Sequence, residues 1–247
     1  SDQRGRRSRA AGMIAAGGSW GIAAFPLIAF LVALYFGIQL IRRYVARRRE
    51  FEGIWALALL MYATASLAMF AGVLNGWSSL GFRTYWVLGA VLNVPFLFVG
   101  EAYLLAKRRA VAHVLLGLLV IGTVFAIYRV SSAPLNQQQL AKTFPLGKEV
   151  FGDNSAPYRL SQLYSFPAYF LLLGGLAWSA LTMGRVPALR TRTVGVLLIA
   201  AGATIVAIGS GVGAAFRILP LFSVSLAAGV AVMFWGFLKT VARPPTP

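Results

Sequence analysis

TYWVLGAVLNVPFLFVGEAYLLAKRRAVAHVLLGLLVIGTVFAIY, residues 84–128, consists of two long apolar runs separated only by the basic triplet at 107–109. A membrane core about 30 Å thick is crossed by about 20 apolar residues at a rise of about 1.5 Å per residue, and each run is long enough. Because the triplet leaves no room for a longer connection, we expect the two runs to form an antiparallel pair of membrane-spanning helices.

The same criterion finds five further apolar runs, so the chain is predicted to be an all-α polytopic membrane protein with a seven-helix bundle. The predicted spans cover residues 20–41, 54–74, 84–106, 110–128, 164–183, 194–212 and 218–238. They form one transmembrane domain, residues 20–238, between a basic N-terminal tail (1–19) and a C-terminal tail (239–247).

The composition excludes several classes of protein. Of 247 residues, 59% are hydrophobic and 12% are charged, with a mean hydropathy of +0.75, whereas a soluble domain has about 25% charged residues. A water-soluble enzyme, a disordered chain and a fibrous repeat are therefore excluded. The net charge of +17 comes from basic clusters between apolar runs, a pattern that predicts membrane topology and no nucleic-acid partner.

The basic clusters also predict an orientation, because short cytoplasmic loops carry an excess of Lys and Arg. The segments at 42–49, 107–109, 185–192 and 239–243 hold thirteen basic residues, and the opposite segments hold six. The richer side is expected to be cytoplasmic, with the N-terminus outside and the C-terminus inside. The bias towards Arg, Ala and Gly further suggests a bacterial protein of the plasma membrane.

The N-terminal tail conflicts with this orientation, because Arg4, Arg6, Arg7 and Arg9 would lie outside. Three explanations remain open. Met13 is the true start, the tail lies along the membrane surface, or the tail begins a cleaved signal peptide.

The polar connection at 131–163 is predicted to form an external cap over the bundle. Long loops without secondary structure are uncommon in compact proteins unless they act as lids or binding elements or are disordered. One short amphipathic helix is expected over 135–144, and Asp153, Asn154 and Ser155 are expected to cap the next helix. The cap either binds a ligand or partner, or merely packs on the helix ends.

Glu101 and Asn93 form a candidate polar site inside the third span. Ionisable groups within a membrane are costly and are functional candidates. Asn93 shares a helix face with Gly89 and Gly100, and Pro95 favours a kink, so this face is expected to look into the bundle. Glu101 either handles protons or cations, or anchors the helix through an ion pair or hydrogen bond at the cytoplasmic rim.

Gly195, Gly202 and Gly209 recur one heptad apart in the sixth span. Small residues allow helix backbones to approach closely in lipid, so we expect these glycines to pack the last three spans together. The fifth span contributes Gly174 and Gly175 to the same expectation.

The residues needed for known catalytic and cofactor chemistry are missing. The chain has no Cys and one His, His113, so no catalytic residues, metal site or cofactor is predicted, although a bound lipid remains possible. Seven spans with the N-terminus outside is the outline of rhodopsins, but the last span has no lysine before Lys239. A retinal Schiff base is therefore excluded.

Three strings resemble uncharacterised seven-span bacterial integral membrane proteins. They are YWVLGAVLNVPFLFVGEAYLLAKRR (85–109), PLGKEVFGDNS (145–155) and LYSFPAYFLLLGGLAWSA (163–180). The resemblance covers roughly residues 84–180 and implies no particular activity.

Three functions remain in competition. The first is a non-enzymatic subunit or sensor-like module that acts through protein partners, such as other membrane subunits or a second copy, or through an external ligand. The second is a carrier or channel for small solutes, ions or lipids through the bundle interior. The third, a lipid-modifying enzyme, is disfavoured because no acid–base or metal cluster is present.

Overall fold

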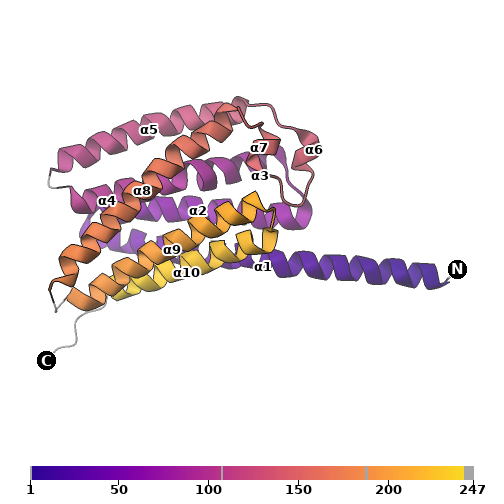
Figure 1. The fold of residues 1–247 in the computed structure, drawn as a ribbon, viewed down its shortest axis with the longest axis horizontal. Helices are drawn as coiled ribbons and strands as arrows, with labels where there is room; N and C mark the ends of the chain where they lie inside the picture. The colour runs from indigo at the N-terminus through magenta and orange to yellow at the C-terminus, as the bar shows by residue number, and fades with distance from the viewer. Residues whose placement is uncertain (1, 107, 187–188, 242–247) are drawn as a thin grey trace.

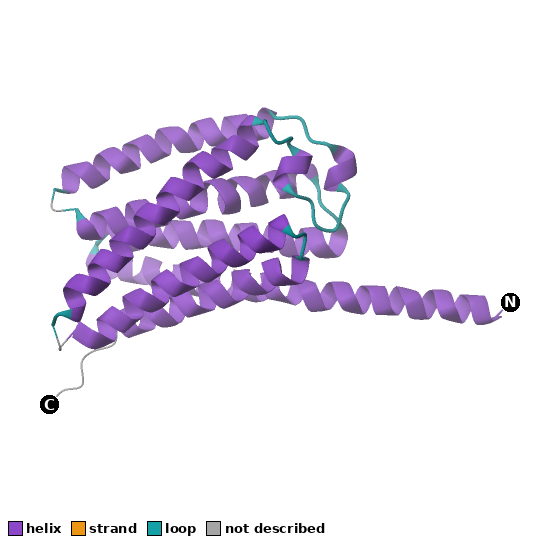
Figure 2. Cartoon of the chain, in the orientation of Figure 1, coloured by secondary structure: helices purple, strands orange, loops and turns teal. Residues whose placement is uncertain are grey.

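The computed structural model describes residues 2–106, 108–186 and 189–241, and the regular elements in these ranges are helices (Figure 2). The elements are α1 (Asp2–Arg47), α2 (Glu50–Asn75), α3 (Ser79–Tyr85), the π-helix η1 (Trp86–Leu92), α4 (Asn93–Leu105), α5 (Arg109–Ser132), α6 (Gln137–Leu140), α7 (Gly147–Val150), α8 (Ala156–Gly184), α9 (Arg190–Ala215) and α10 (Leu219–Val241). The all-α prediction is confirmed.

Seven helical stretches are long and apolar enough to cross a membrane, and each corresponds to one of the seven predicted spans. The third of them, Ser79–Leu105, is composite, because α3, η1 and α4 follow one another without interruption. The fifth begins at Ala156, earlier than the apolar run alone predicted. Ser155 explains this, since its hydroxyl accepts a hydrogen bond from the Tyr158 backbone N–H and caps α8, as expected.

The helices are arranged as two hairpins with further helices packed beside them (Figure 1). α1 pairs with α2, α9 pairs with α10, and α1 also packs against α10. α4 lies between α2 and α8, while α8 crosses the bundle obliquely and reaches α9. α5 has few neighbours, so most of its apolar side chains remain exposed on the outside of the bundle.

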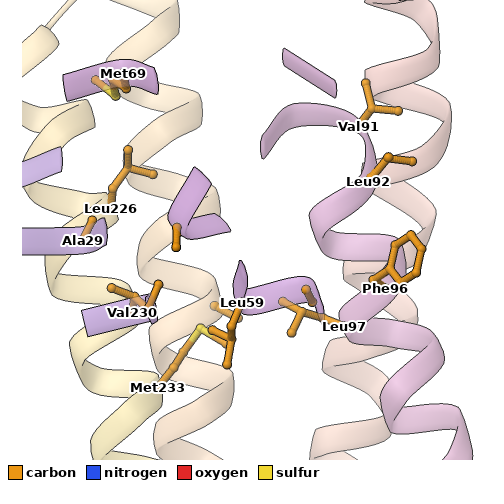
Figure 3. Packing of buried hydrophobic residues seen from close by; sticks show 14 of the residues in the cluster. Ala29, Leu59, Met69, Val91, Leu92, Phe96, Leu97, Leu226, Val230 and Met233 are labelled. Carbon is orange, nitrogen blue, oxygen red and sulfur yellow. The ribbon is translucent and has the colours of Figure 1, made fainter. Parts of the chain in front are cut away.

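The core is a continuous apolar cluster to which α1, α2, the composite third span, α8, α9 and α10 contribute. Figure 3 shows part of it, with Leu59 and Met69 of α2, Phe96 of α4, and Val230 and Met233 of α10. Most of these side chains are less than a tenth exposed. Helices in lipid lack a hydrophobic driving force for association, so this cluster stabilises the bundle through close packing.

The connection between α5 and α8, residues 133–155, folds over one end of the bundle, and we call it the cap. The single helix expected over 135–144 is not what forms. Asn136 caps the short α6 with its side-chain oxygen, α6 ends at Leu140, and the chain turns through residues 141–144 before Pro145. A second short helix, α7, follows Pro145.

The cap is fixed to the bundle at both ends. The Arg83 guanidinium donates hydrogen bonds to the carbonyl oxygens of Val130 and Ala133, where the cap begins. Glu149 of α7 pairs with Arg217, which lies in the turn between α9 and α10, and its other oxygen lies 3.5 Å from the Lys142 ammonium. The cap is therefore held across the bundle end by both packing and charge.

The parts of the two predicted tails that the structure describes belong to helices. α1 is one helix from Asp2 onward, and its first part projects beyond the bundle (Figure 1). Residue 1 lies outside the described residues. α10 continues to Val241, so the predicted tail at 239–247 begins inside this helix, and residues 242–247 lie outside the described part.

Candidate functional site

A cavity of about 690 Å³ lies between α2, the composite third span, α8, α9 and α10, directly beneath the cap. Small-molecule sites in proteins typically measure about 300–1,000 Å³ and are mostly apolar. The residues that line it are Leu59, Tyr62, Ala65, Ser66, Tyr85, Trp86, Gly89, Ala90, Asn93, Val94, Leu97, 144–148, Tyr158, Ser161, Gln162, Ser165, Phe166, Tyr169, Phe170, Leu172, Ala203, 206–208, Ser210, Gly211, Ala214, Ala215, Phe222, Leu226, Val230 and Met233. Its position and size make this cavity the candidate site.

The cavity exists because α8 and α9 diverge towards the cap (Figure 1). The lining residues come from the first half of α8 and the second half of α9, which lie at the same end because the helices are antiparallel. On α9 the side chains facing the cavity include Ala203, Ala207, Gly211 and Ala214, spaced as one helix face. These residues are too small to fill the space that the divergence leaves.

The π-helix η1 forms one wall. Trp86, Gly89 and Ala90 line the cavity, and Asn93 follows directly after the π-helix. Pro95 has no backbone N–H, so it cannot donate to the carbonyl of Val91 in a regular helix. π-Helical turns are rare and occur frequently at functional sites.

Two side-chain hydrogen bonds hold this wall. The Ser165 hydroxyl of α8 donates to the Ala90 carbonyl oxygen at 2.7 Å. The Asn93 amide donates to the Ala58 carbonyl oxygen at 2.7 Å, and Asn93 is itself buried. The face of Gly89, Asn93 and Gly100 therefore lies against α2, within the bundle.

Several lining side chains already use their donors within the protein. The Tyr62 hydroxyl donates to the Leu226 carbonyl oxygen at 2.9 Å, and the Tyr169 hydroxyl donates to Thr204 Oγ1 at 3.1 Å. The hydroxyl of Tyr85 and the amide of Gln162 make no hydrogen bond with the described residues. The hydroxyls of Ser66 and Tyr158 likewise make none with the described residues, so these four uncharged groups are available to a bound molecule.

Lys148 is the one charged side chain among the described residues that line the cavity. It is exposed, lies at the start of α7, and makes no ion pair with any other described residue. No carboxylate lines the cavity within the described chain. The site therefore combines apolar walls with a single positive charge at the cap.

Apolar side chains close the end of the cavity away from the cap. A separate void of about 10 Å³, enough for little more than one water, is lined by Phe36, Trp55, Leu59, Leu97, Leu172, Ile199 and Met233. Leu59, Leu97, Leu172 and Met233 border both spaces. Figure 3 shows Leu59, Leu97 and Met233 converging, so these four residues, which we call the floor, separate the cavity from the other half of the bundle.

The two residues of the predicted polar site do not share one pocket. Asn93 lines the cavity, whereas Glu101 lies about two turns further along α4 and does not. Glu101 is 2% exposed and packs beside Gly175 of α8, where an added Cβ would lie 2.9 Å from the Glu101 Cδ. Its Oε2 has no hydrogen-bond partner and no ion pair among the described residues, and Lys107 of the expected rim lies outside them.

The three predicted packing glycines lie against α10. A Cβ on Gly195 would lie 2.6 Å from the Gly236 carbonyl oxygen, and one on Gly202 would lie 2.5 Å from the Gly229 carbonyl oxygen. A Cβ on Gly209 would likewise collide with the Ser225 side chain of α10. These contacts join α9 to α10 only, whereas Gly174 of α8 has no neighbour at that distance.

Other residues important to the site were not singled out from the sequence. Lys148 and Trp86 are examples, because their places depend on how the cap folds back. A Cβ on Gly147 would collide with the Trp86 indole, so α7 sits directly on the π-helix. The sequence spacing of Ala203, Ala207 and Gly211 could have indicated this face of the cavity, since three small residues on one helix face allow either a close helix contact or an unfilled space.

The described residues contain no group of three His, Cys, Asp or Glu side chains that would hold a metal ion. His113 lies on the exposed side of α5, with its ring 5.3 Å from that of Tyr103. Comparison with protein-family models, curated proteins and solved structures gives no match to this chain. The likeness to seven-span membrane proteins therefore extends to the seven membrane-spanning helices and assigns no family.

Proposed function

We propose that this polytopic membrane protein is a non-enzymatic, sensor-like module that binds a largely apolar external ligand in the cavity beneath the cap. The observation that carries the proposal is the cavity itself, because packed protein interiors contain few voids larger than a water molecule. A space of about 690 Å³ with mostly apolar walls fits a small apolar or amphipathic molecule.

The apolar floor favours binding over passage. A carrier or channel, the second hypothesis, needs a route that continues through the other half of the bundle. Leu59, Leu97, Leu172 and Met233 close that route with aliphatic side chains. Transport would require these side chains to separate, whereas binding and sensing require no such step.

The lining residues support a binding role without catalysis. Acid–base and metal chemistry depend on clustered titratable groups, and Lys148 is the one charged residue among the described lining positions. We infer that the ligand is held and not converted. Its occupancy would be passed to a protein partner or a second copy of this chain, while membrane lipids cover the exposed apolar face of α5.

The proposal places the cap outside a bacterial plasma membrane, following the excess of basic residues at the opposite end. The native chain has no cysteine, so one introduced at Arg48 can be labelled without background. We expect a membrane-impermeant thiol reagent to leave Arg48→Cys unmodified in intact cells. Modification there would reverse the orientation and place the cap inside.

The binding proposal is tested by replacing each of two alanines of α9 with phenylalanine. Ala207 lines the cavity, and Ala207→Phe should fill part of it. Ala201 lies on the same helix with an exposed side chain, so Ala201→Phe is the matched control. We expect native mass spectrometry in mild detergent to show a bound small molecule with the wild type and Ala201→Phe but not with Ala207→Phe. Equal occupancy in all three proteins would contradict the proposal.

A further inference from the structure

We propose that the occupant is an amphiphile with one apolar chain and an anionic head group, and that it enters from the membrane leaflet at the cap end with its head beside Lys148. This inference rests on the proposed function and specifies its ligand class. The polarity gradient, the depth, the side opening and the charge of the cavity each support it.

The lining changes from polar near the cap to apolar at the floor. The polar side chains that line the cap half are Ser66, Tyr85, Tyr158, Ser161, Gln162, Ser165 and Ser210. Tyr62, Asn93 and Tyr169 lie deeper, and each donates its hydrogen bond within the protein. The residues furthest from the cap are Leu59, Leu97, Leu172, Val230 and Met233, all of them apolar. An unbonded polar group in an apolar site costs free energy. The gradient therefore favours a molecule with a polar head at the cap and an apolar chain pointing to the floor.

The depth of the cavity matches one leaflet. On α10 the lining residues run from Phe222 to Met233, which corresponds to about 16 Å of helix at about 1.5 Å per residue. A bilayer core is about 30 Å thick, so the cavity reaches from the cap end to about the middle of the membrane. A hydrocarbon chain in one leaflet occupies the same depth.

The cavity wall is incomplete between α8 and α9. Phe166 and Phe170 of α8 and Ile208 of α9 line the cavity, yet they are 60%, 66% and 60% exposed. A side chain that borders a cavity and is also exposed on the bundle surface marks the edge of an opening. This edge lies where lipid chains would contact the bundle, so a membrane amphiphile reaches the cavity without crossing water.

Lys148 gives the head-group end of the cavity a positive charge. Lys148 is exposed at the cavity and has no ion-pair partner among the described residues. The neighbouring Glu149 is shared by Lys142 and Arg217, which leaves this part of the cap positive. A carboxylate or phosphate head beside Lys148 would gain a charge-assisted hydrogen bond, which is stronger than a bond between neutral groups.

The inference is tested by comparing a fluorescent dodecanoate with the dodecanol that carries the same label. Both ligands are titrated into the purified full chain, the Lys148→Gln and Lys148→Glu variants, and the control Arg159→Gln. Arg159 is a basic residue close to the cap that does not line the cavity. We expect the wild type and the control to bind dodecanoate at least about tenfold more tightly than dodecanol, and both Lys148 variants to lose that preference.

The outcomes separate this inference from the proposed function. If Ala207→Phe abolishes dodecanol binding while the Lys148 variants keep the preference for dodecanoate, the cavity binds ligands but the head-group assignment is wrong. If the wild type binds neither compound, or Ala207→Phe binds both as well as the wild type does, the amphiphile site itself is contradicted. Circular dichroism of each variant checks that the helices remain folded.

Discussion

α9 contacts its two neighbours in opposite ways, although both faces carry small residues. Towards α10, Gly195 and Gly202 oppose Gly236 and Gly229, and the two backbones come into direct contact. Towards α8, small side chains such as Ala207 border a cavity of about 690 Å³. Small residues on one helix therefore close an interface only when the facing helix also has small residues there and its axis stays close along the contact. Where the facing helix diverges, the same residue types leave a binding space.

The largest effect is expected from breaking the closed interface with Gly202→Leu. The added side chain would collide with the Gly229 carbonyl oxygen and with Met233, and overpacking a core costs about 1–3 kcal/mol. We expect a clearly lower melting temperature in detergent. Gly174→Leu is the control, because Gly174 has no neighbour within 4 Å. A Gly202→Leu protein that melts like the wild type would show that this face does not pack against α10.

Gly147→Leu tests the open side by displacing the cap. Because α7 lies directly on Trp86, any side chain at 147 would push the cap away from the π-helix. We expect a smaller loss of stability than for Gly202→Leu, about 1 kcal/mol, together with weaker binding of dodecanol. Ala141→Leu, on the exposed part of the cap, should leave binding unchanged. Wild-type binding by Gly147→Leu would mean that the cap does not close the cavity.

Glu149→Gln loosens the same cap without changing its shape. The substitution removes the ion pairs with Arg217 and Lys142, which are partly exposed and contribute at most about 1 kcal/mol. Hydrogen exchange should become faster in residues 140–150 while the melting temperature changes little. Asp153→Asn serves as the control for loss of one negative charge in the cap. Unchanged exchange would indicate that apolar contacts alone hold the cap.

Glu101 should show the smallest effect on stability. A rim partner would make leucine more costly than glutamine, whereas Oε2 has no hydrogen-bond partner to lose among the described residues. We therefore expect the free energies of unfolding of Glu101→Gln and Glu101→Leu to lie within about 1 kcal/mol of the wild-type value. A large loss of stability in the leucine variant alone would support the anchor interpretation. A loss of ligand or ion response in Glu101→Gln with unchanged melting would favour ion handling.

The seven spans could be predicted because the thickness of a bilayer converts directly into a length of apolar sequence. The ends of the helices could not, since α8 extends through polar residues once Ser155 caps it. The π-helix could be predicted only indirectly, from Pro95, because a proline indicates a kink but does not indicate that the kink takes the form of a π-helix.

The site was only partly visible in the sequence. Asn93 was identified because it shares a helix face with Gly89 and Gly100 that was expected to look into the bundle, and the structure pairs it with the Ala58 carbonyl oxygen. The cavity depends on the divergence of α8 from α9, which no local pattern encodes. Lys148 was hidden for a similar reason, because the folding of the cap decides whether it faces water or the cavity.

The accessibility of Ala207 tests the central claim, that a ligand occupies the space between α8 and α9. The native chain has no cysteine, so Ala207→Cys and Ala201→Cys can each be treated with an apolar thiol reagent in membranes, with and without dodecanol. We predict that both cysteines react and that dodecanol slows the reaction only at 207. An unreactive Ala207→Cys, or equal rates with and without dodecanol, would contradict the account.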